Sequence, residues 1–216
     1  VEFVADIRAR HETTDLPIVV NGLIGPAGDA YEPGTMLSPA DALLTHEPQF
    51  HALGRAGVDM ISAMTLTHAG EASGIAIAAR EIDVPIAIAF TLETDGRLPS
   101  GQPLDEAIAE VDKATDATPI YYMINCAHPD HFHYILDRFE PWTSRIGGLR
   151  TNASRLSHAE LDESETLDDG DPEELSQLNA ALLRLLPNIR VVGGCCGTDH
   201  RHVGCIARHD LVERAA

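Results

Sequence analysis

Short apolar segments recur along the chain, and each is followed by polar turn residues and then by a pattern with helical spacing. Polar residues seldom alternate with apolar ones inside these segments, as in PIAIAF at 85–90. Parallel strands that are covered on both faces have this character. The pattern predicts six strands, at residues 17–21, 58–63, 85–91, 119–126, 146–151 and 189–194. Strands that alternate with helices in this way are typical of α/β architecture.

Two of the intervening helices have clear start signals. Ser38 and Asp171 can each cap a helix with the side-chain oxygen, and each is followed by a proline, which suits the first helical position. We therefore expect helices to begin at Pro39 and Pro172. Pro48 interrupts the helical pattern of the first one, which predicts a kink or a split there.

Length and charge narrow the class of protein. The chain has 216 residues, of which 44% are hydrophobic, and this predicts one globular domain over residues 1–216. The formal net charge is −19, from 34 acidic and 15 basic residues, and this argues against a nucleic-acid partner. No apolar run is long enough to span a bilayer, and the first fifteen residues do not resemble a signal peptide. We expect a cytoplasmic protein without a membrane partner.

Cysteines stand at the ends of two predicted strands. The segment 193–197 reads Gly-Gly-Cys-Cys-Gly, and Cys126 follows Asn125 at the end of another apolar run. Neighbouring side chains of a strand point to opposite faces, so Cys195 and Cys196 can share an ion only where the backbone bends, and the flanking glycines permit that bend. Three thiolates favour zinc, and three protein ligands leave one position open, as in catalytic zinc sites. Structural zinc or reduced core thiols are the alternatives.

Other candidate ligands fit structural roles better. Cys205 lies in an apolar stretch and is interpreted as a small buried side chain on a helix. The acidic run at 162–174 lacks the ordered spacing of a calcium loop and predicts a solvated loop. Five loop histidines could offer a fourth zinc ligand, although solvation or helix capping is the more common role. They are His128, His131, His133, His200 and His202.

The two cysteine motifs resemble those of the zinc-dependent homocysteine S-methyltransferases. Segments at 24–29, 90–101 and 150–153 also resemble the family pattern. The resemblance implies a (β/α)8 TIM barrel, in which Asn-Cys follows a late strand and Gly-Gly-Cys-Cys-Gly the last. Family members begin with a glycine-rich first strand and a second strand that this sequence lacks, so we expect an N-terminally incomplete copy. The strands at 17–21 and 189–194 would then flank a gap with exposed edges.

The resemblance also implies a reaction and a site. A methyl group moves from a sulfonium or ammonium donor to a small-molecule thiol acceptor such as homocysteine, which gives methionine. Cys126, Cys195 and Cys196 would hold the Zn²⁺ that activates the acceptor thiol. Polar side chains at neighbouring strand ends are the substrate-binding candidates, with capping or strand-end hydrogen bonding as the alternative. They are Thr65, Thr91, Asn125 and Asn152.

One position departs from the family pattern. Met64 stands where members usually carry a glutamate that contacts the amino group of homocysteine. This departure puts the identity of the acceptor in question. The competing hypotheses are a non-catalytic fragment or pseudo-enzyme of the same fold and, because the chain has no Cys-X-X-Cys motif, less favourably a thiol redox protein.

Overall fold

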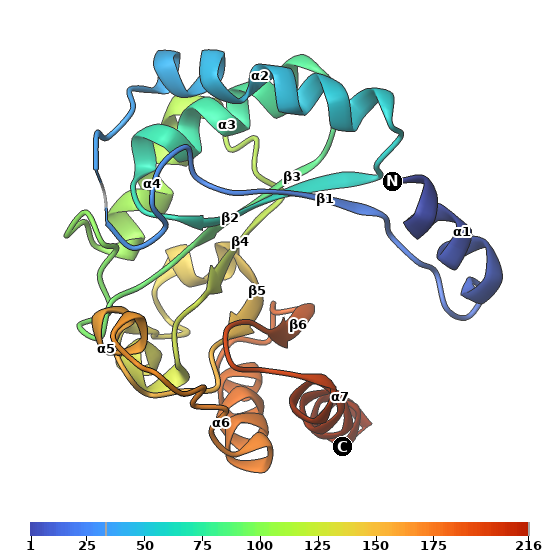
Figure 1. Cartoon of the computed structure of the whole chain (residues 1–216), viewed down its shortest axis with the longest axis vertical. Helices are drawn as coiled ribbons and strands as arrows, with labels where there is room; N and C mark the ends of the chain where they lie inside the picture. The colour runs from blue at the N-terminus through green and yellow to red at the C-terminus, as the bar shows by residue number, and fades with distance from the viewer. Residues whose placement is uncertain (33, 216) are drawn as a thin grey trace.

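Six parallel strands form one curled sheet in the order β1-β2-β3-β4-β5-β6 (Figure 1). The computed structural model of the chain describes residues 1–32 and 34–215, with side chains as far as residue 209. The sequence prediction of an α/β fold with six parallel strands is confirmed. The strands are β1 (Asn21–Ile24), β2 (Met60–Leu66), β3 (Ile86–Phe90), β4 (Tyr121–Asn125), β5 (Ile146–Thr151) and β6 (Val191–Gly194).

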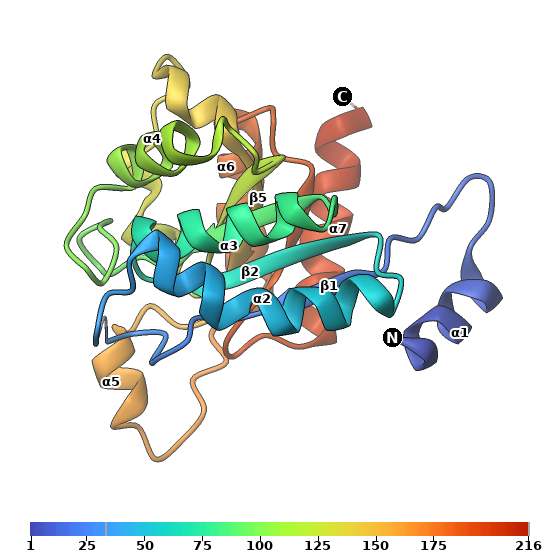
Figure 2. The same ribbon diagram turned by 90° about the horizontal axis from the view of Figure 1, so that it is seen from above.

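Helices cover the outer face of the sheet. Helices α2, α3 and α4 lie side by side along one part of it, and α6 and α7 pack together beyond β5 (Figures 1 and 2). Three short 3-10 turns, η1 (Pro129–His131), η2 (His133–Ile135) and η3 (Pro141–Arg145), connect β4 to β5. The helices are α1 (Glu2–His11), α2 (Pro39–Arg55), α3 (Ala69–Glu81), α4 (Leu104–Thr115), α5 (His158–Asp162), α6 (Pro172–Leu185) and α7 (His200–Ala215).

The first strand lies further along the chain than the sequence pattern predicts. The prediction placed it at 17–21, but β1 begins at Asn21, which pairs with Met60 of β2. Side chains satisfy the preceding backbone instead, because the Val20 amide donates to Asp59 Oδ2 at 2.6 Å and the Ile18 amide to Glu12 Oε1 at 2.9 Å. Apolar composition alone does not separate this segment from a strand.

Helix α2 is continuous across Pro48, which corrects the expectation of a split helix. Pro48 lies on the exposed side of α2, where water can bond the carbonyl oxygen that the proline leaves free. Both predicted caps are present. The Ser38 hydroxyl accepts from the Asp41 amide at 3.2 Å, and Asp171 Oδ1 accepts from the Glu173 amide at 2.8 Å.

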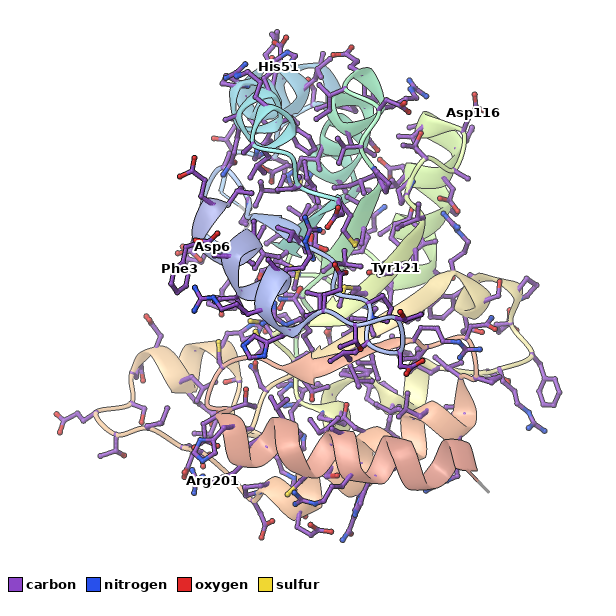
Figure 3. All side chains as sticks on the ribbon, turned by 90° about the vertical axis from the view of Figure 1, so that its right-hand side faces the viewer. Phe3, Asp6, His51, Asp116, Tyr121 and Arg201 are labelled. Atoms are coloured by element: carbon purple, nitrogen blue, oxygen red, sulfur yellow. The ribbon has the colours of Figure 1, made fainter. Side chains whose placement is uncertain are left out.

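The core lies between the sheet and the helices that cover it, whereas the N-terminal helix stays outside. Phe50 of α2 and Phe90 of β3 are fully buried in this core. Helix α1 buries none of its residues, and Phe3 on it is 75% exposed (Figure 3). Among the described residues β1 and β6 pair with one neighbour each, so both are sheet edges. No described helix has the length and apolarity that a membrane span requires.

Candidate metal centre

Three adjacent strand ends are tied together where the cysteine motifs stand. The Cys126 amide, after β4, donates to the Arg150 carbonyl of β5 at 3.1 Å. The Cys195 amide, after β6, donates to the Thr151 carbonyl at 2.8 Å. These bonds continue the β4-β5-β6 ladder beyond the regular strands. The carboxyl ends of parallel strands meet at one edge of a sheet, which is why motifs seventy positions apart reach one place.

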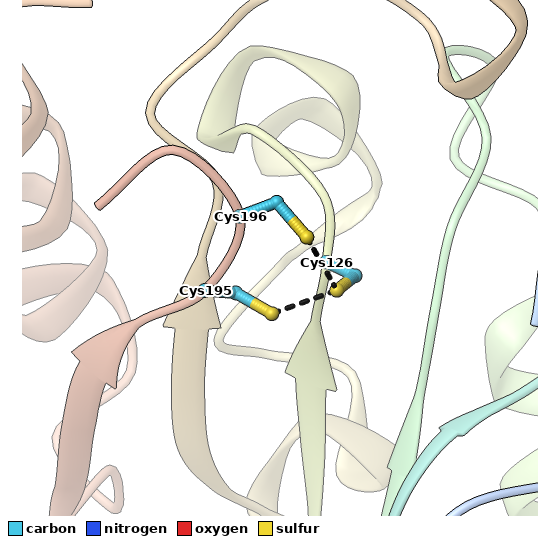
Figure 4. Close-up of side chains that lie close together, drawn as sticks. All are labelled: Cys126, Cys195 and Cys196. Atoms are coloured by element: carbon cyan, nitrogen blue, oxygen red, sulfur yellow. Dashed lines mark hydrogen bonds between the residues drawn. The ribbon is translucent and has the colours of Figure 1, made fainter. Parts of the chain in front are cut away.

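The three thiols converge at this edge (Figure 4). Cys126 Sγ lies 2.7 Å from Cys195 Sγ and 3.6 Å from Cys196 Sγ, and all three cysteines are free thiols. Two sulfurs bound tetrahedrally at about 2.3 Å from zinc would be about 3.8 Å apart, so the Cys126–Cys196 distance fits and the Cys126–Cys195 distance must open. Positive φ at Cys126, 55°, turns its side chain toward the other two. Three thiol sulfurs are a set of ligand atoms that suits a soft tetrahedral ion.

The three thiols share protons through hydrogen bonds, and this shifts their pKa values in opposite directions. Bonds from the Cys126 and Cys195 thiols lower the pKa of Cys196, whereas the bonds with Cys195 and Cys196 and the burial of the site raise the pKa of Cys126. A cluster in which one sulfur is readily ionised is suited to a cation, because a metal replaces the shared protons.

Two of the predicted substrate-binding residues bond to each other. Asn125 Oδ1 accepts from the Thr65 amide at 2.9 Å, and Asn125 Nδ2 donates to Thr65 Oγ1 at 2.8 Å. Thr65 has φ 61°, which is unfavourable for a β-branched residue. The paired bonds hold this strained end of β2 beside the Asn125-Cys126 turn. Met64, the neighbour of Thr65, is half-buried on β2.

The other two candidates position the cysteine motifs. The Thr91 hydroxyl donates to the Cys126 carbonyl at 3.4 Å, and Asn152 Oδ1 accepts from the Cys196 amide at 3.1 Å. Both residues are buried. The structure therefore places all four candidates around the cysteines and gives each a hydrogen bond within the protein, which is the alternative that the sequence left open.

Sequence reasoning missed two aromatic residues at the site. The Tyr31 hydroxyl donates to Cys126 Sγ at 3.6 Å and lies 3.8 Å from Cys196 Sγ. The Tyr31 ring packs against His158 with 4.2 Å between centroids, and His158 Nε2 donates to the Cys126 carbonyl at 2.6 Å. Burial and the neighbouring thiols raise the pKa of Tyr31, so its hydroxyl stays protonated. The sequence did contain a signal for the helix that begins at His158, because Ser157 and Glu160 form the capping box of α5.

The five loop histidines bond elsewhere or lie exposed. His128 Nδ1 caps η1 by accepting from the Asp130 amide, and burial lowers the pKa of His128 to about 4. His131 Nε2 contacts the Arg155 carbonyl, and His133 Nδ1 contacts the Pro129 carbonyl. The remaining two, His200 and His202, are at the start of α7, where His200 is exposed and His202 contacts Asp199 and the Asp169 carbonyl.

Cys205 and the acidic run match their structural interpretations. Cys205 is buried on α7, and Arg208 Nη2 donates to its sulfur at 2.9 Å. The acids of 162–174 are mostly exposed, and several hold single partners, such as Asp169 with Arg201 and Glu174 with Arg155. Among the described residues, only the three clustered cysteines form a group that could hold a metal.

Comparison with solved structures defines the class of fold. The chain is similar to the homocysteine methyltransferase MmuM from Escherichia coli, with a TM-score of 0.68 and 20% identity for the apo form over 96% of this chain and 68% of that one. The metallated form gives a TM-score of 0.69 at 21% identity, covering 96% and 66% of the two chains. The curled sheet and its helices therefore have the fold of MmuM.

Sequence comparison then identifies the family. The homocysteine S-methyltransferase family model matches residues 1–209, so the chain belongs to that family. The chain is also 25% identical over 175 residues to homocysteine S-methyltransferase 1 from Arabidopsis thaliana, which covers 78% of this chain. It spans 51% of the length of that relative. The family predicted from the cysteine motifs is confirmed.

Proposed function

We propose that residues 1–216 form a catalytic domain of a zinc-dependent methyltransferase that transfers a methyl group to a thiol such as homocysteine, giving methionine. The observation that carries the proposal is the convergence of Cys126, Cys195 and Cys196 at the carboxyl edge of the sheet. Family membership supports the reaction class. Free thiols at the site are compatible with a reducing compartment such as the cytoplasm.

The proposed ligands are the three cysteines, with the fourth position left for the acceptor sulfur. Zinc in this site would supply the Lewis acidity that keeps a bound thiol deprotonated at neutral pH. The Tyr31 hydroxyl already contacts the sulfurs of Cys126 and Cys196. An acceptor sulfur that enters the site must therefore displace the Tyr31 hydroxyl or form a hydrogen bond with it. Asn152 and Thr91 bond to the backbone of Cys196 and Cys126 and so hold the two cysteine turns in place. Fixed cysteine turns would in turn fix the position at which the acceptor sulfur meets the methyl donor.

The proposed transfer is a direct displacement. The acceptor thiol loses its proton to solvent, and its sulfur forms a bond to the methyl carbon as the donor's bond to that carbon breaks. Both electrons of the broken bond remain with the donor, which departs as a neutral thioether or tertiary amine. The positive charge of the donor is therefore lost in the reaction, and no oxidant or reductant is needed.

Isotope transfer tests this function in the full natural protein. We expect about one zinc per chain and deuterated methionine when homocysteine is incubated with a CD3-labelled donor. S-methylmethionine, S-adenosylmethionine and betaine are the donors to compare by mass spectrometry. Zinc-loaded protein that forms no methylated thiol with any of them would contradict the proposal and favour the non-catalytic hypothesis. Absence of bound zinc would favour the redox hypothesis.

Met64 predicts weak use of homocysteine. A thioether cannot form the charge-assisted hydrogen bond by which a glutamate holds an ammonium group, and losing such a bond costs about 1.5–3 kcal/mol. We expect Met64→Glu to lower the apparent KM for homocysteine roughly ten- to hundredfold. Steady-state kinetics with zinc present measure the change.

The matched control is Met64→Gln, which has the size of glutamate without its charge. We expect it to leave the KM near that of the native protein. If the native protein already uses homocysteine efficiently and Met64→Glu gives no improvement, the departure from the family pattern is harmless and this prediction is wrong.

A further inference from the structure

His158 is not one of the clustered cysteines' neighbours in sequence, yet it bonds to the backbone of one of them. It is the first residue of α5 and is buried, with 8% of its surface exposed. His158 Nε2 donates to the Cys126 carbonyl at 2.6 Å, whereas the Thr91 hydroxyl reaches the same oxygen at 3.4 Å. The bond from His158 is therefore the stronger of the two side-chain restraints on this carbonyl.

The backbone of Cys126 requires such a restraint. Its φ of 55° lies in the left-handed region, which residues with a Cβ occupy at a cost in free energy. The sheet holds only one end of the residue, where the Cys126 amide donates to the Arg150 carbonyl at 3.1 Å. His158 holds the other end. Without it, the turn could relax toward negative φ, and Cys126 Sγ would swing away from the other two sulfurs.

Glu93 holds the His158 ring from its other side. Its Oε1 lies 3.2 Å from His158 Nδ1, so the ring is placed between a carboxylate and the Cys126 carbonyl. Glu93 follows β3 and is itself fixed in a turn, because its amide donates to the Arg97 carbonyl at 2.8 Å and its carbonyl accepts from the Gly96 amide at 2.9 Å. One imidazole thus joins the segments after β3 and β4 to the start of α5.

The His158 ring also supports Tyr31. The two rings lie 4.2 Å apart between centroids, and the Tyr31 hydroxyl is 3.6 Å from Cys126 Sγ. His158 can therefore act on the cysteine cluster in two ways, through a hydrogen bond to the Cys126 backbone or through aromatic packing on Tyr31. The hydrogen bond acts on the direction of a proposed metal ligand, whereas the packing acts on a residue that is not a ligand.

We infer that His158 is a positioning residue for the zinc ligand Cys126, and that Glu93 holds the His158 ring in the bonding orientation. The inference rests on the zinc site of the proposed function and adds to it the side chains that aim one of its sulfurs. Changes in residues that support metal ligands typically cost about 10- to 100-fold in metal affinity. We expect a cost of this size when the bond to the Cys126 carbonyl is lost.

Two substitutions at one position separate the two ways of acting. His158→Phe keeps a ring beside Tyr31 but has no N–H, whereas His158→Gln has an N–H about as far from the backbone as Nε2 but no ring. Competition with a chromophoric chelator measures zinc affinity in the natural protein. We expect His158→Phe to bind zinc about 10- to 100-fold more weakly and His158→Gln to stay within about threefold of the native affinity. Glu93→Gln should give a smaller loss than His158→Phe, up to about fivefold.

Cobalt in place of zinc gives a second measurement. The thiolate-to-cobalt charge-transfer absorption, taken per bound ion, reports how many thiolates bind the metal. We expect it to fall in His158→Phe, toward the intensity of a site with two thiolates, and to stay at the native level in His158→Gln. A purely structural role would reduce the amount of folded protein without changing the intensity per bound ion.

His131→Phe is the matched control. His131 is also 8% exposed, and its Nε2 contacts a backbone carbonyl at 2.8 Å, but this carbonyl belongs to Arg155 and not to a cysteine turn. We expect the control to keep the native zinc affinity and the native cobalt absorption. An equal loss of zinc in His131→Phe and His158→Phe would show a general effect of removing a buried histidine, and would overturn the inference.

Other results would also overturn it. They are a native zinc affinity in His158→Phe, and a loss in His158→Gln that equals or exceeds the loss in His158→Phe. Metal binding is measured without turnover, so the two proposals can fail separately. Zinc binding that depends on His158 in a protein that forms no methionine would contradict the proposed function alone. A native protein that binds neither zinc nor cobalt would contradict both.

Discussion

Replacing Cys196 by serine is expected to remove zinc and methyl transfer together. Cys196 is the most exposed of the three clustered cysteines, so the substitution alters the donor set with little effect on the core. Changes in the groups that merely support metal ligands already cost 10- to 100-fold, and loss of a ligand should therefore cost more than about 10²-fold in activity. Metal analysis of the purified protein and the labelled-methyl assay measure the two losses.

Cys205→Ser is the matched control for this experiment. Cys205 is also a free cysteine near the C-terminal end of the chain, but it lies on α7, where Arg208 contacts its sulfur. Serine can still accept from Arg208, so we expect normal zinc content and activity. If Cys196→Ser keeps its zinc and its activity, the three-cysteine site is wrong. If both variants lose zinc, the loss reflects general disruption of the C-terminal region.

The cysteine cluster could be predicted because it depends on sheet topology alone. Strand ends of a parallel sheet lie at one edge, so apolar runs that end at Cys126 and at Cys195 suffice to bring the motifs together. The backbone bonds from Cys126 to Arg150 and from Cys195 to Thr151 show how directly this follows from the ladder. Residues fixed by the regular part of a fold are the ones that the sequence pattern identifies.

The rest of the site could not be predicted, because it depends on the paths of loops. Tyr31 reaches the sulfurs from the segment between β1 and α2, and Asp168, in the segment between α5 and α6, lines the cavity beside Cys196. Neither path follows from local periodicity. Contacts remote in sequence determine them, such as the close approach of Asp168 to Gly197. The predicted position of the first strand was wrong for a similar reason, because the Val20 amide bonds to the Asp59 side chain, which is remote in sequence.

The buried carboxylate of Glu71 also makes contacts between segments that are remote in sequence. Its Oε1 accepts from the Ala27 amide at 2.7 Å and from His46 Nε2 at 2.8 Å, and His68 Nε2 lies 3.7 Å from Oε2. Glu71 belongs to the first turn of α3, His46 to α2, and Ala27 to the loop that carries Tyr31. A single side chain thus connects two helices to the loop that covers the cysteines.

Removal of this carboxylate by Glu71→Ala is expected to lower the free energy of unfolding by about 3–5 kcal/mol, because buried donors on His46 and Ala27 would lose their acceptor. Urea titration measures the change. Glu71→Gln should lower the free energy of unfolding by less, because its amide oxygen can still accept from the Ala27 amide. Glu47→Ala is the control, because Glu47 also pairs with a histidine, His51, but at the surface, where the cost is within about 1 kcal/mol.

The pH dependence of unfolding provides an independent check of the same contact. Burial alone would raise the pKa of Glu71, but the hydrogen bonds from His46 and the Ala27 amide outweigh it, so the pKa in the folded protein is lowered. The stabilisation is therefore complete above the pKa of an unfolded glutamate, about 4.3, and is lost as the pH falls through the lower folded value. Native protein should lose this increment in acid, while Glu71→Gln should not. Equal acid sensitivity in the two proteins would show that the Glu71 carboxylate does not contribute to holding the Tyr31 loop on the fold.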